Sequence, residues 1–203
     1  MAYDQAYFDK WYRSRTHRVR SPAQIRRIVA FTLAAAEYVL DRPVRSVLDV
    51  GAGEGNWQPV LKKLRPALTY VGVEPSTYAV GRYGKRRGLR LGSLESLVDL
   101  HLHESHPEGF DLVICCGVLN YVPGRALGDA LEQLALHTGG LAWLELFTAR
   151  DEVEGDIADM KPRPAAWYRT HLAAAGLIPC GLHLYAPTDR AAALAALETG
   201  RLD

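Results

Sequence analysis

A short glycine-rich stretch next to an acid holds the residue types in this sequence that are best suited to bind a ligand. Residues 46–57 read SVLDVGAGEGNW, with Asp49 just before three closely spaced glycines. Glycines let a strand end in a sharp turn and let the backbone approach a ligand, since they carry no Cβ. Glu74 follows a second apolar run, 70–73, and an acid at such a place accepts hydrogen bonds from ribose hydroxyls. The pattern predicts a nucleotide-like ligand.

The residue at position 56 distinguishes between two kinds of ligand-binding glycine loop. The dinucleotide fingerprint G-x-G-x-x-G needs a third glycine there, and this chain has Asn56. The pattern VLDVGAGEG instead resembles the first motif of class I S-adenosylmethionine-dependent methyltransferases, and the resemblance extends from about residue 44 to about residue 185. In that family, the acid at the place of Asp49 helps to hold the amino group of the methionine moiety. Glu74 does not distinguish NAD from S-adenosylmethionine, so the choice rests on Asp49 and the missing glycine.

The resemblance also implies where the rest of the cofactor, S-adenosyl-L-methionine, would lie. Family members commonly carry an acid for the adenine amino group where this chain has Ser93, and Leu94 would contact the ring. The loop after the strand expected at 110–116 would face the methyl group, because open α/β sheets bind ligands at the carboxyl ends of their strands. The expected cofactor-binding residues are Asp49, Gly51, Ala52, Gly53, Asn56, Trp57, Glu74, Pro75, Ser93, Leu94, Cys116 and Gly117.

Methyl transfer is an in-line displacement that demands no fixed catalytic residue, although a base helps if the acceptor is a hydroxyl or a protonated amine. Glu145 lies near the end of an expected central strand, where an unpaired buried carboxylate would be costly, so we expect it to face the cleft. The candidate catalytic residues are Glu145, Tyr121 and His171. The expected substrate contacts are Tyr12, Arg13, Arg18, Asn120, Tyr121 and Trp167.

The N-terminal region combines aromatic and basic residues. Aromatic residues recur at spacings of about four between Tyr3 and Tyr12, which in a helix places them on one face. This helix is either packed scaffold or a lid over the cofactor, whose sulfonium would be attracted to aromatic rings. The arginines from Arg13 to Arg27 form either a solvated face or a site for an anion.

Composition limits the partners. The formal net charge of +1 and a pI of about 7.8 give no general case for nucleic acid or an anionic membrane. A small molecule is therefore the expected acceptor. RNA, held by the N-terminal arginines and the basic stretch 82–90, is the alternative. A non-catalytic cofactor-binding protein that partners another chain is the third possibility, and the oligomeric state stays open.

The cysteines and the hydropathy pattern indicate a cytoplasmic protein. Three cysteines with no C-x-x-C pair suit a reducing compartment, and we expect no disulfide. We expect no secretory signal, since the first twenty residues hold no apolar run, and no later run has the length that spans a bilayer. His101, His103 and His106 lack the further ligands of a zinc site, so we expect no metal.

Apolar runs alternate with helical stripes, which predicts an α/β fold. We expect an open, mostly parallel twisted sheet of six or seven strands with helices on both faces, plus an N-terminal helical extension. Strands are expected at 47–50, 70–74, 89–91, 110–116, 141–147 and 177–185. The chain 1–203 is read as one domain with an N-terminal extension at 1–43, a Rossmann-like core at 44–186 and a C-terminal helix at 187–203.

Overall fold

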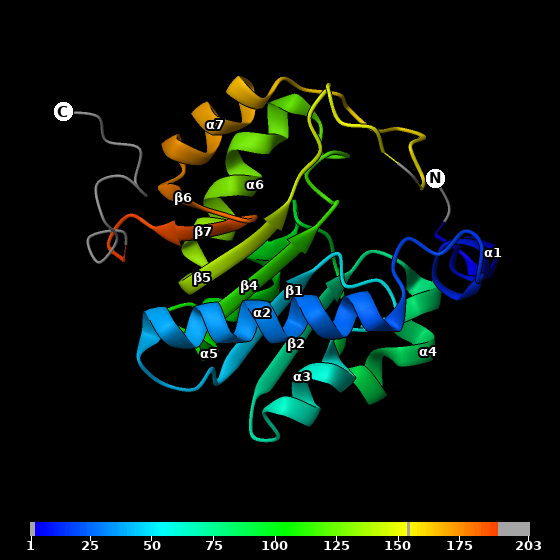
Figure 1. The fold of residues 1–203 in the computed structure, drawn as a ribbon, viewed down its shortest axis with the longest axis horizontal. Helices are drawn as coiled ribbons and strands as arrows, with labels where there is room; N and C mark the ends of the chain where they lie inside the picture. Colours follow the sequence, from blue (N-terminus) through cyan, green and yellow to red (C-terminus); the bar gives the residue numbers. More distant parts are fainter. Residues whose placement is uncertain (1–2, 154, 191–203) are drawn as a thin grey trace.

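The computed structural model describes residues 3–153 and 155–190, and these form one sheet with helices on both faces (Figure 1). The strand order is β3-β2-β1-β4-β5-β7-β6. The α/β class and the mostly parallel sheet are therefore confirmed. Most of the C-terminal helix expected at 187–203 lies outside the described residues.

Parallel pairing brings the ends of the first five strands to one edge of the sheet. β7 pairs antiparallel with both β5 and β6. The strands are β1 (Ser46–Val50), β2 (Thr69–Glu74), β3 (Leu89–Leu91), β4 (Phe110–Cys116), β5 (Thr138–Glu145), β6 (Leu177–Gly181) and β7 (Leu184–Pro187). Asp49, Glu74, Cys116 and Glu145 are thus placed near the carboxyl ends of adjacent strands, where ligands bind in such sheets.

Helices cover the sheet on both sides because successive side chains along a strand alternate in direction. Val47 and Leu112 belong to the core shared with α2 and α3, whereas Leu48 and Val113 belong to the core shared with α6 and α7 (Figure 1). The helices are α1 (Gln5–Phe8), the π-helical turn η1 (Asp9–Arg13), α2 (Pro22–Leu40), α3 (Gln58–Leu64), α4 (Thr77–Arg87), the 3-10 turn η2 (Leu97–Leu100), α5 (Leu102–Ser105), α6 (Gly124–Leu136) and α7 (Ala165–Ala174).

Two helix starts behave as their sequences predict. Ser21 and Gln24 form a reciprocal capping box at the start of α2, with Pro22 in the first turn. Ser76 caps α4 through the amide of Ala79. These caps fix where α2 and α4 begin, and so fix the segments that lead into the candidate site.

The fifth strand starts earlier than the sequence pattern predicts. We expected the strand to begin at residue 141, but Gly139 and Gly140 already lie within β5. They stand opposite the single residue Asp111 in a β-bulge, since the register shifts between Phe110 and Leu112. A Cβ on Gly140 would lie 2.2 Å from the Asp111 carbonyl oxygen. The glycines are therefore required by the close approach of two backbones.

The last expected strand, 177–185, is instead an antiparallel hairpin of β6 and β7. Leu182 and His183 occupy the turn with φ of 51° and 64°, a left-handed conformation usually left to glycine or asparagine. Leu184 then pairs with Trp143 of β5. This hairpin gives the sheet seven strands, the upper of the two expected numbers. No described helix combines the length and apolarity needed to cross a membrane.

Candidate active site

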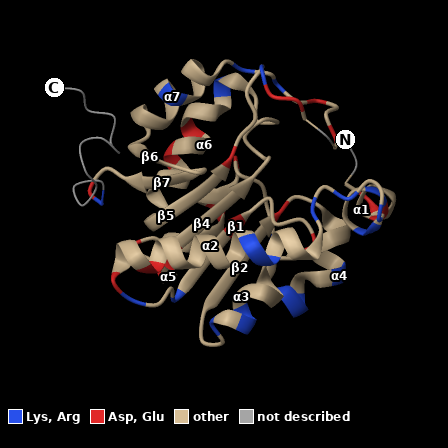
Figure 2. Cartoon of the chain, viewed as in Figure 1, with Lys and Arg blue, Asp and Glu red and all other residues tan. Residues whose placement is uncertain are grey.

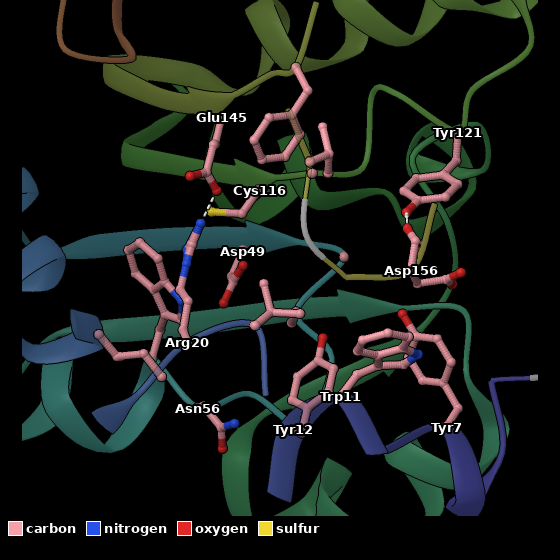
Figure 3. A pocket seen from close by; sticks show the side chains of 18 of the residues that line it. Tyr7, Trp11, Tyr12, Arg20, Asp49, Asn56, Cys116, Tyr121, Glu145 and Asp156 are labelled. Atoms are coloured by element: carbon pink, nitrogen blue, oxygen red, sulfur yellow. Dashed lines mark hydrogen bonds and ion pairs between the residues drawn. The ribbon is translucent and has the colours of Figure 1, made fainter. Parts of the chain in front are cut away.

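A cavity of about 200 Å³ lies at the carboxyl ends of β1, β4 and β5 (Figure 3). One side is formed by the sheet and its loops, and the other by the N-terminal segment and the loop after β5. Its lining residues are Tyr7, Trp11, Tyr12, Val19, Arg20, Ile25, Asp49, Gly51, Ala52, Asn56, Trp57, Cys116, Gly117, Tyr121, Glu145, Phe147, Val153, Asp156 and Met160.

The glycine loop turns the chain away from β1 at the floor of this cavity. Gly51 and Gly53 have φ of 72° and 58°, a region that side chains other than glycine rarely adopt. The amides of Gly51 and Ala52 donate to the carbonyl of Val73, at 2.8 and 3.1 Å. The loop is thereby held against the end of β2, next to Glu74.

Asp49 is a buried carboxylate that lines the cavity. Only 3% of it is exposed, and its Oδ2 accepts a hydrogen bond of 2.7 Å from the Tyr70 hydroxyl. Burial raises the pKa of Asp49 to about 7, although the Tyr70 hydrogen bond opposes this rise. A cation placed beside Asp49 would favour its ionised form, so the site is suited to an ammonium group.

Glu74 is buried beside the glycine loop but does not line the cavity. Its Oε2 accepts from the Gly53 amide at 2.7 Å and its Oε1 from the Ser76 amide at 3.0 Å. Burial raises the pKa of Glu74, whereas the two amide hydrogen bonds lower it. The carboxylate stands at the place expected for a ribose partner, with its approach covered by the N-terminal segment.

Tyr12 covers the glycine loop. A Cβ on Gly53 would lie 2.2 Å from the Tyr12 hydroxyl, so this ring fills the space above the glycine. Phe8, which is 1% exposed, packs against Tyr12 with ring centroids 4.9 Å apart. The cavity is smaller than the roughly 300 to 1,000 Å³ of typical ligand sites because these rings occupy part of the crevice.

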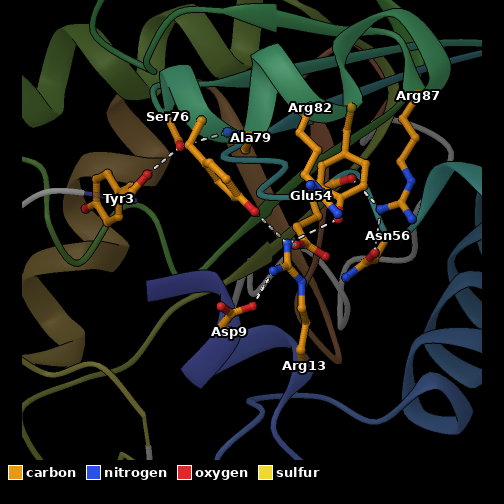
Figure 4. A network of polar contacts seen from close by, with 11 residues as sticks. Tyr3, Asp9, Arg13, Glu54, Asn56, Ser76, Ala79, Arg82 and Arg87 are labelled. Atoms are coloured by element: carbon orange, nitrogen blue, oxygen red, sulfur yellow. Dashed lines mark hydrogen bonds and ion pairs between the residues drawn. The ribbon is translucent and has the colours of Figure 1, made fainter. Parts of the chain in front are cut away.

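An ion-pair network holds the N-terminal segment in this position (Figure 4). The Arg13 guanidinium donates to Glu54 in the glycine loop and to Asp9 one turn back in its own segment. It also donates to the hydroxyls of Tyr78 and Tyr83, each at 3.2 Å. Glu54 is only 5% exposed, so Arg13 is the partner that its buried carboxylate requires.

Breaking this network should release the segment. We expect Arg13→Met to speed chymotrypsin cleavage between Tyr7 and Tyr12 about tenfold, because cleavage follows the population of the open form. The exposed Arg15→Met is the matched control and should leave the rate unchanged. Equal rates in both variants would mean that aromatic packing alone holds the segment.

A second ion pair joins the N-terminal segment to the end of β5. Arg20 donates to Glu145, and each side chain is 18% exposed. The Arg20 guanidinium also lies 5.7 Å from the centre of the Trp143 ring. Cys116 lines the cavity beside this pair, and burial raises the pKa of its thiol, so it is a neutral wall residue there.

A match to a known protein family identifies the class of protein that carries this cavity and glycine loop. A family model described as a methyltransferase domain matches residues 16–177. The chain belongs to this methyltransferase family. The resemblance inferred from VLDVGAGEG is thereby confirmed, and no curated protein sequence matches the chain.

Solved structures share the fold of this methyltransferase at low sequence identity. Magnesium protoporphyrin IX methyltransferase from Synechocystis, solved with S-adenosylhomocysteine, is 18% identical with a TM-score of 0.60, covering 86% of each chain. The sugar N-methyltransferase KedS8 from Streptoalloteichus is 21% identical with a TM-score of 0.58, covering 85% of each chain. The [4+2]-cyclase SpnF is 22% identical with a TM-score of 0.53, covering 77% of this chain and 58% of its own. The last shows that this fold also occurs in a protein named for a different reaction.

The residues fit S-adenosylmethionine, the cofactor of class I methyltransferases. At the methionine end, the buried Asp49 faces a cavity and is suited to an ammonium group. At the ribose end, Glu74 and the glycine loop are in place, but Tyr12 lies over Gly53. The Tyr12 ring therefore fills space next to two of the residues expected to bind the cofactor, Gly53 and Glu74.

The structure brings many of the predicted site residues together at the cavity. Seven of the expected cofactor-binding residues line it, and so do two of the catalytic candidates and two of the expected substrate contacts. The cofactor-binding residues are Asp49, Gly51, Ala52, Asn56, Trp57, Cys116 and Gly117. The catalytic candidates are Glu145 and Tyr121, and the substrate contacts are Tyr12 and, once more, Tyr121. The Asn56 side chain is engaged by Arg87, which donates to its Oδ1 at 2.7 Å.

Other predicted residues lie away from the cavity lining: Gly53, Glu74, Pro75, Ser93, Leu94, Arg13, Arg18, Asn120, Trp167 and His171. Asn120 is fully buried and exchanges hydrogen bonds with the backbone of Phe147, so it fixes the loop after β4. His171 stacks on Trp167 at 3.9 Å within α7. The structure thus gives Asn120, Trp167 and His171 packing roles, and gives Arg13 the role of holding the segment.

Several lining residues were not among the predicted ones. They are Tyr7, Trp11, Val19, Arg20, Ile25, Phe147, Val153, Asp156 and Met160. Tyr7 and Trp11 belong to the aromatic stripe, which was a usable signal. The loop residues Val153, Asp156 and Met160 carry no pattern that distinguishes them from their neighbours.

Proposed function

We propose that this methyltransferase transfers a methyl group from S-adenosylmethionine to an oxygen or nitrogen atom of a small molecule. The observation that carries the proposal is the buried Asp49, which lines the cavity beside the glycine loop. Burial raises the pKa of this acid to about 7, and a cationic partner favours its ionised form; the amino group of the cofactor is such a partner.

When bound, S-adenosylmethionine supplies a methyl group on a positively charged sulfur. Asp49 would hold its amino group and Glu74 its ribose hydroxyls. The rings of Tyr7 and Trp11, which line the opposite wall, would exclude water and attract positive charge. The contribution of the protein is then mainly to orient the two reactants, an effect worth roughly 7 to 11 kcal/mol in general.

Glu145 is the best placed group to accept a proton from the acceptor. It lines the cavity at the end of β5, and its carboxylate is a base when Arg20 does not occupy it. Tyr121 also lines the cavity, but burial raises its pKa to about 12 and its hydroxyl donates to the Asp156 carbonyl. Tyr121 is therefore suited to orient the acceptor as a neutral group.

A small acceptor is favoured over RNA. KedS8 is named as a sugar methyltransferase and the Synechocystis enzyme as a porphyrin one, which supports small acceptors for related folds. Figure 2 shows basic residues distributed over the N-terminal segment and over α2, α3, α4 and α7. On α4, Arg87 donates to the backbone carbonyl of Glu54 and to Asn56 Oδ1, and its guanidinium lies over the Tyr83 ring. The guanidinium of Arg87 thus has partners within the protein, and these contacts give no support to a role in binding a phosphate.

The cytoplasm is the location that we infer with this function. Cys115 and Cys116 are adjacent thiols that are not joined in a disulfide, which suits a reducing compartment.

The test combines binding and transfer. We expect calorimetry to detect S-adenosylmethionine and S-adenosylhomocysteine and to detect no NAD. Methyl-labelled cofactor should then label small amines or alcohols in a fractionated extract, and should leave RNA unlabelled. Binding of NAD alone, or labelling of RNA alone, would overturn the proposal.

A further inference from the structure

The ion pair of Arg20 and Glu145 lines the same cavity as Asp49 (Figure 3). Figure 3 shows the Arg20 guanidinium next to Cys116 and Glu145, with the Asp49 carboxylate close by. Both members of the pair line the cavity and are largely buried. Arg20 is therefore a cation in the cavity wall, and its ion-pair partner, Glu145, also belongs to the cavity wall.

The charges along the cavity are unequal. Three carboxylates line it, on Asp49, Glu145 and Asp156, and within the described chain Arg20 is the one Lys or Arg among the lining residues. The methionine end of S-adenosylmethionine carries an ammonium and a carboxylate on the same carbon. If Asp49 holds the ammonium, the carboxylate must lie within a few ångströms of it and needs a donor.

A guanidinium is well suited to this task, because its planar fork binds a carboxylate through two parallel hydrogen bonds. Arg13 is already paired with Asp9 and Glu54, and Arg42 with Asp111, and neither arginine lines the cavity. The Arg20 guanidinium lies over the ring of Trp143, a cation-π contact that does not depend on Glu145. It can therefore change its anionic partner with little displacement.

We propose that Arg20 is a cofactor-binding residue that exchanges partners: it leaves Glu145 and binds the carboxylate of the methionine moiety. The exchange releases Glu145, which then faces the acceptor as an unpaired carboxylate. Cofactor binding thus prepares the group that receives the acceptor, and the acceptor follows the cofactor. This inference rests on the proposed function.

Two probes separate the role of Arg20 from general effects on the site. The first is S-adenosylhomocysteine, and the second is its decarboxylated analogue, which keeps the amino group and lacks the carboxylate. In calorimetry, Arg20→Met should weaken binding of S-adenosylhomocysteine about tenfold to thirtyfold. The same change should alter binding of the decarboxylated analogue by less than about twofold, because that ligand offers nothing for Arg20 to bind.

Glu145→Gln tests the exchange itself. Removing the competing carboxylate should tighten binding of S-adenosylhomocysteine several-fold, and adding Arg20→Met should abolish this gain. Arg15→Met, an exposed arginine of the same segment, is the control and should leave both affinities unchanged. Arg20→Lys, which keeps the charge without the fork, should fall between the wild type and Arg20→Met, and thermal unfolding verifies that each variant is folded.

The outcomes distinguish this inference from the proposed function. Equal losses for both probes in Arg20→Met, or weaker binding in Glu145→Gln, would overturn the role of Arg20 while cofactor binding stands. Failure of the wild type to bind either probe would overturn the proposed function itself.

Discussion

Replacing Asp49 with Asn is expected to weaken binding of S-adenosylhomocysteine by at least about a hundredfold. Asparagine has the same shape and can still accept the Tyr70 hydrogen bond, so the geometry of the site is kept. What is lost is the negative charge, and a buried ammonium without its partner costs about 3 to 5 kcal/mol. Calorimetry measures the change, and Asp99→Asn, at an exposed acid, is the matched control.

The pH dependence gives a second signature of Asp49. In the free protein its pKa is raised to about 7 by burial, so below pH 7 the carboxyl must lose a proton when an ammonium binds. Affinity should therefore rise about tenfold per pH unit up to about pH 7 and then level off. Asp49→Asn should show no such rise. A wild-type affinity that is flat from pH 5 to pH 8 would contradict the assignment.

Stability should change in the opposite direction to affinity. The folded pKa of Asp49 lies above its unfolded value of 3.8, so its contribution to stability is full below pH 3.8 and is lost as pH rises through about 7. Asp49→Asn removes this loss, and the variant should be as stable as the wild type or more stable at pH 8. A damaged fold would instead lower both affinity and stability, and thermal unfolding separates the two cases.

Gly140→Ala is expected to lower the free energy of unfolding by about 3 kcal/mol or more. A Cβ there would lie 2.2 Å from the Asp111 carbonyl oxygen, inside the bulge between β4 and β5. Asp111 cannot yield easily, since its carboxylate accepts two hydrogen bonds from Arg42, at 2.7 and 2.9 Å, and one from the Arg45 amide. The melting temperature should fall by about 6 to 12 °C.

Gly128→Ala is the matched control, and its expected effect has the opposite sign. Gly128 lies inside α6, and a Cβ there meets no atom within 4 Å. Alanine is the better helix former, so the free energy of unfolding should rise by up to about 1 kcal/mol. Equal destabilisation by both changes would show that the bulge has room for a side chain.

Much of the fold could be predicted because its signals are local. The runs 47–50 and 110–116 are apolar enough to require burial on both faces, and the Ser21 capping box marks the start of α2. The two errors arose where local signals are ambiguous. Gly139 and Gly140 could end a helix or allow two backbones to meet, and only the pairing of β4 with β5 decides between these. At the hairpin turn, Gly181 ends β6, but the two turn residues themselves, Leu182 and His183, are neither glycine nor asparagine, so the sequence pattern continues as a strand.

The site was predictable only on its sheet side. Asp49 and Glu145 end parallel strands, and parallel strands bring their ends to one edge, so spacing along the chain predicts nearness in space. The opposite wall depends on how the N-terminal segment docks. Four arginines fall between positions 13 and 20, and nothing in their order shows that Arg20 enters the cavity while Arg13 binds Glu54.

The cavity has two walls of different construction. Asp49 and Glu145 project from a sheet that is fixed by its cores on both faces, whereas Tyr7, Trp11 and Tyr12 lie on a separate stretch tied down at Arg13 and Arg20. Under the proposed function, we therefore expect acceptor preference to change when residues 3–20 are changed. If residues 3–20 are exchanged with Arg13 and Arg20 kept, Asp49 and Glu145 should retain their positions, because the sheet holds them independently of this stretch.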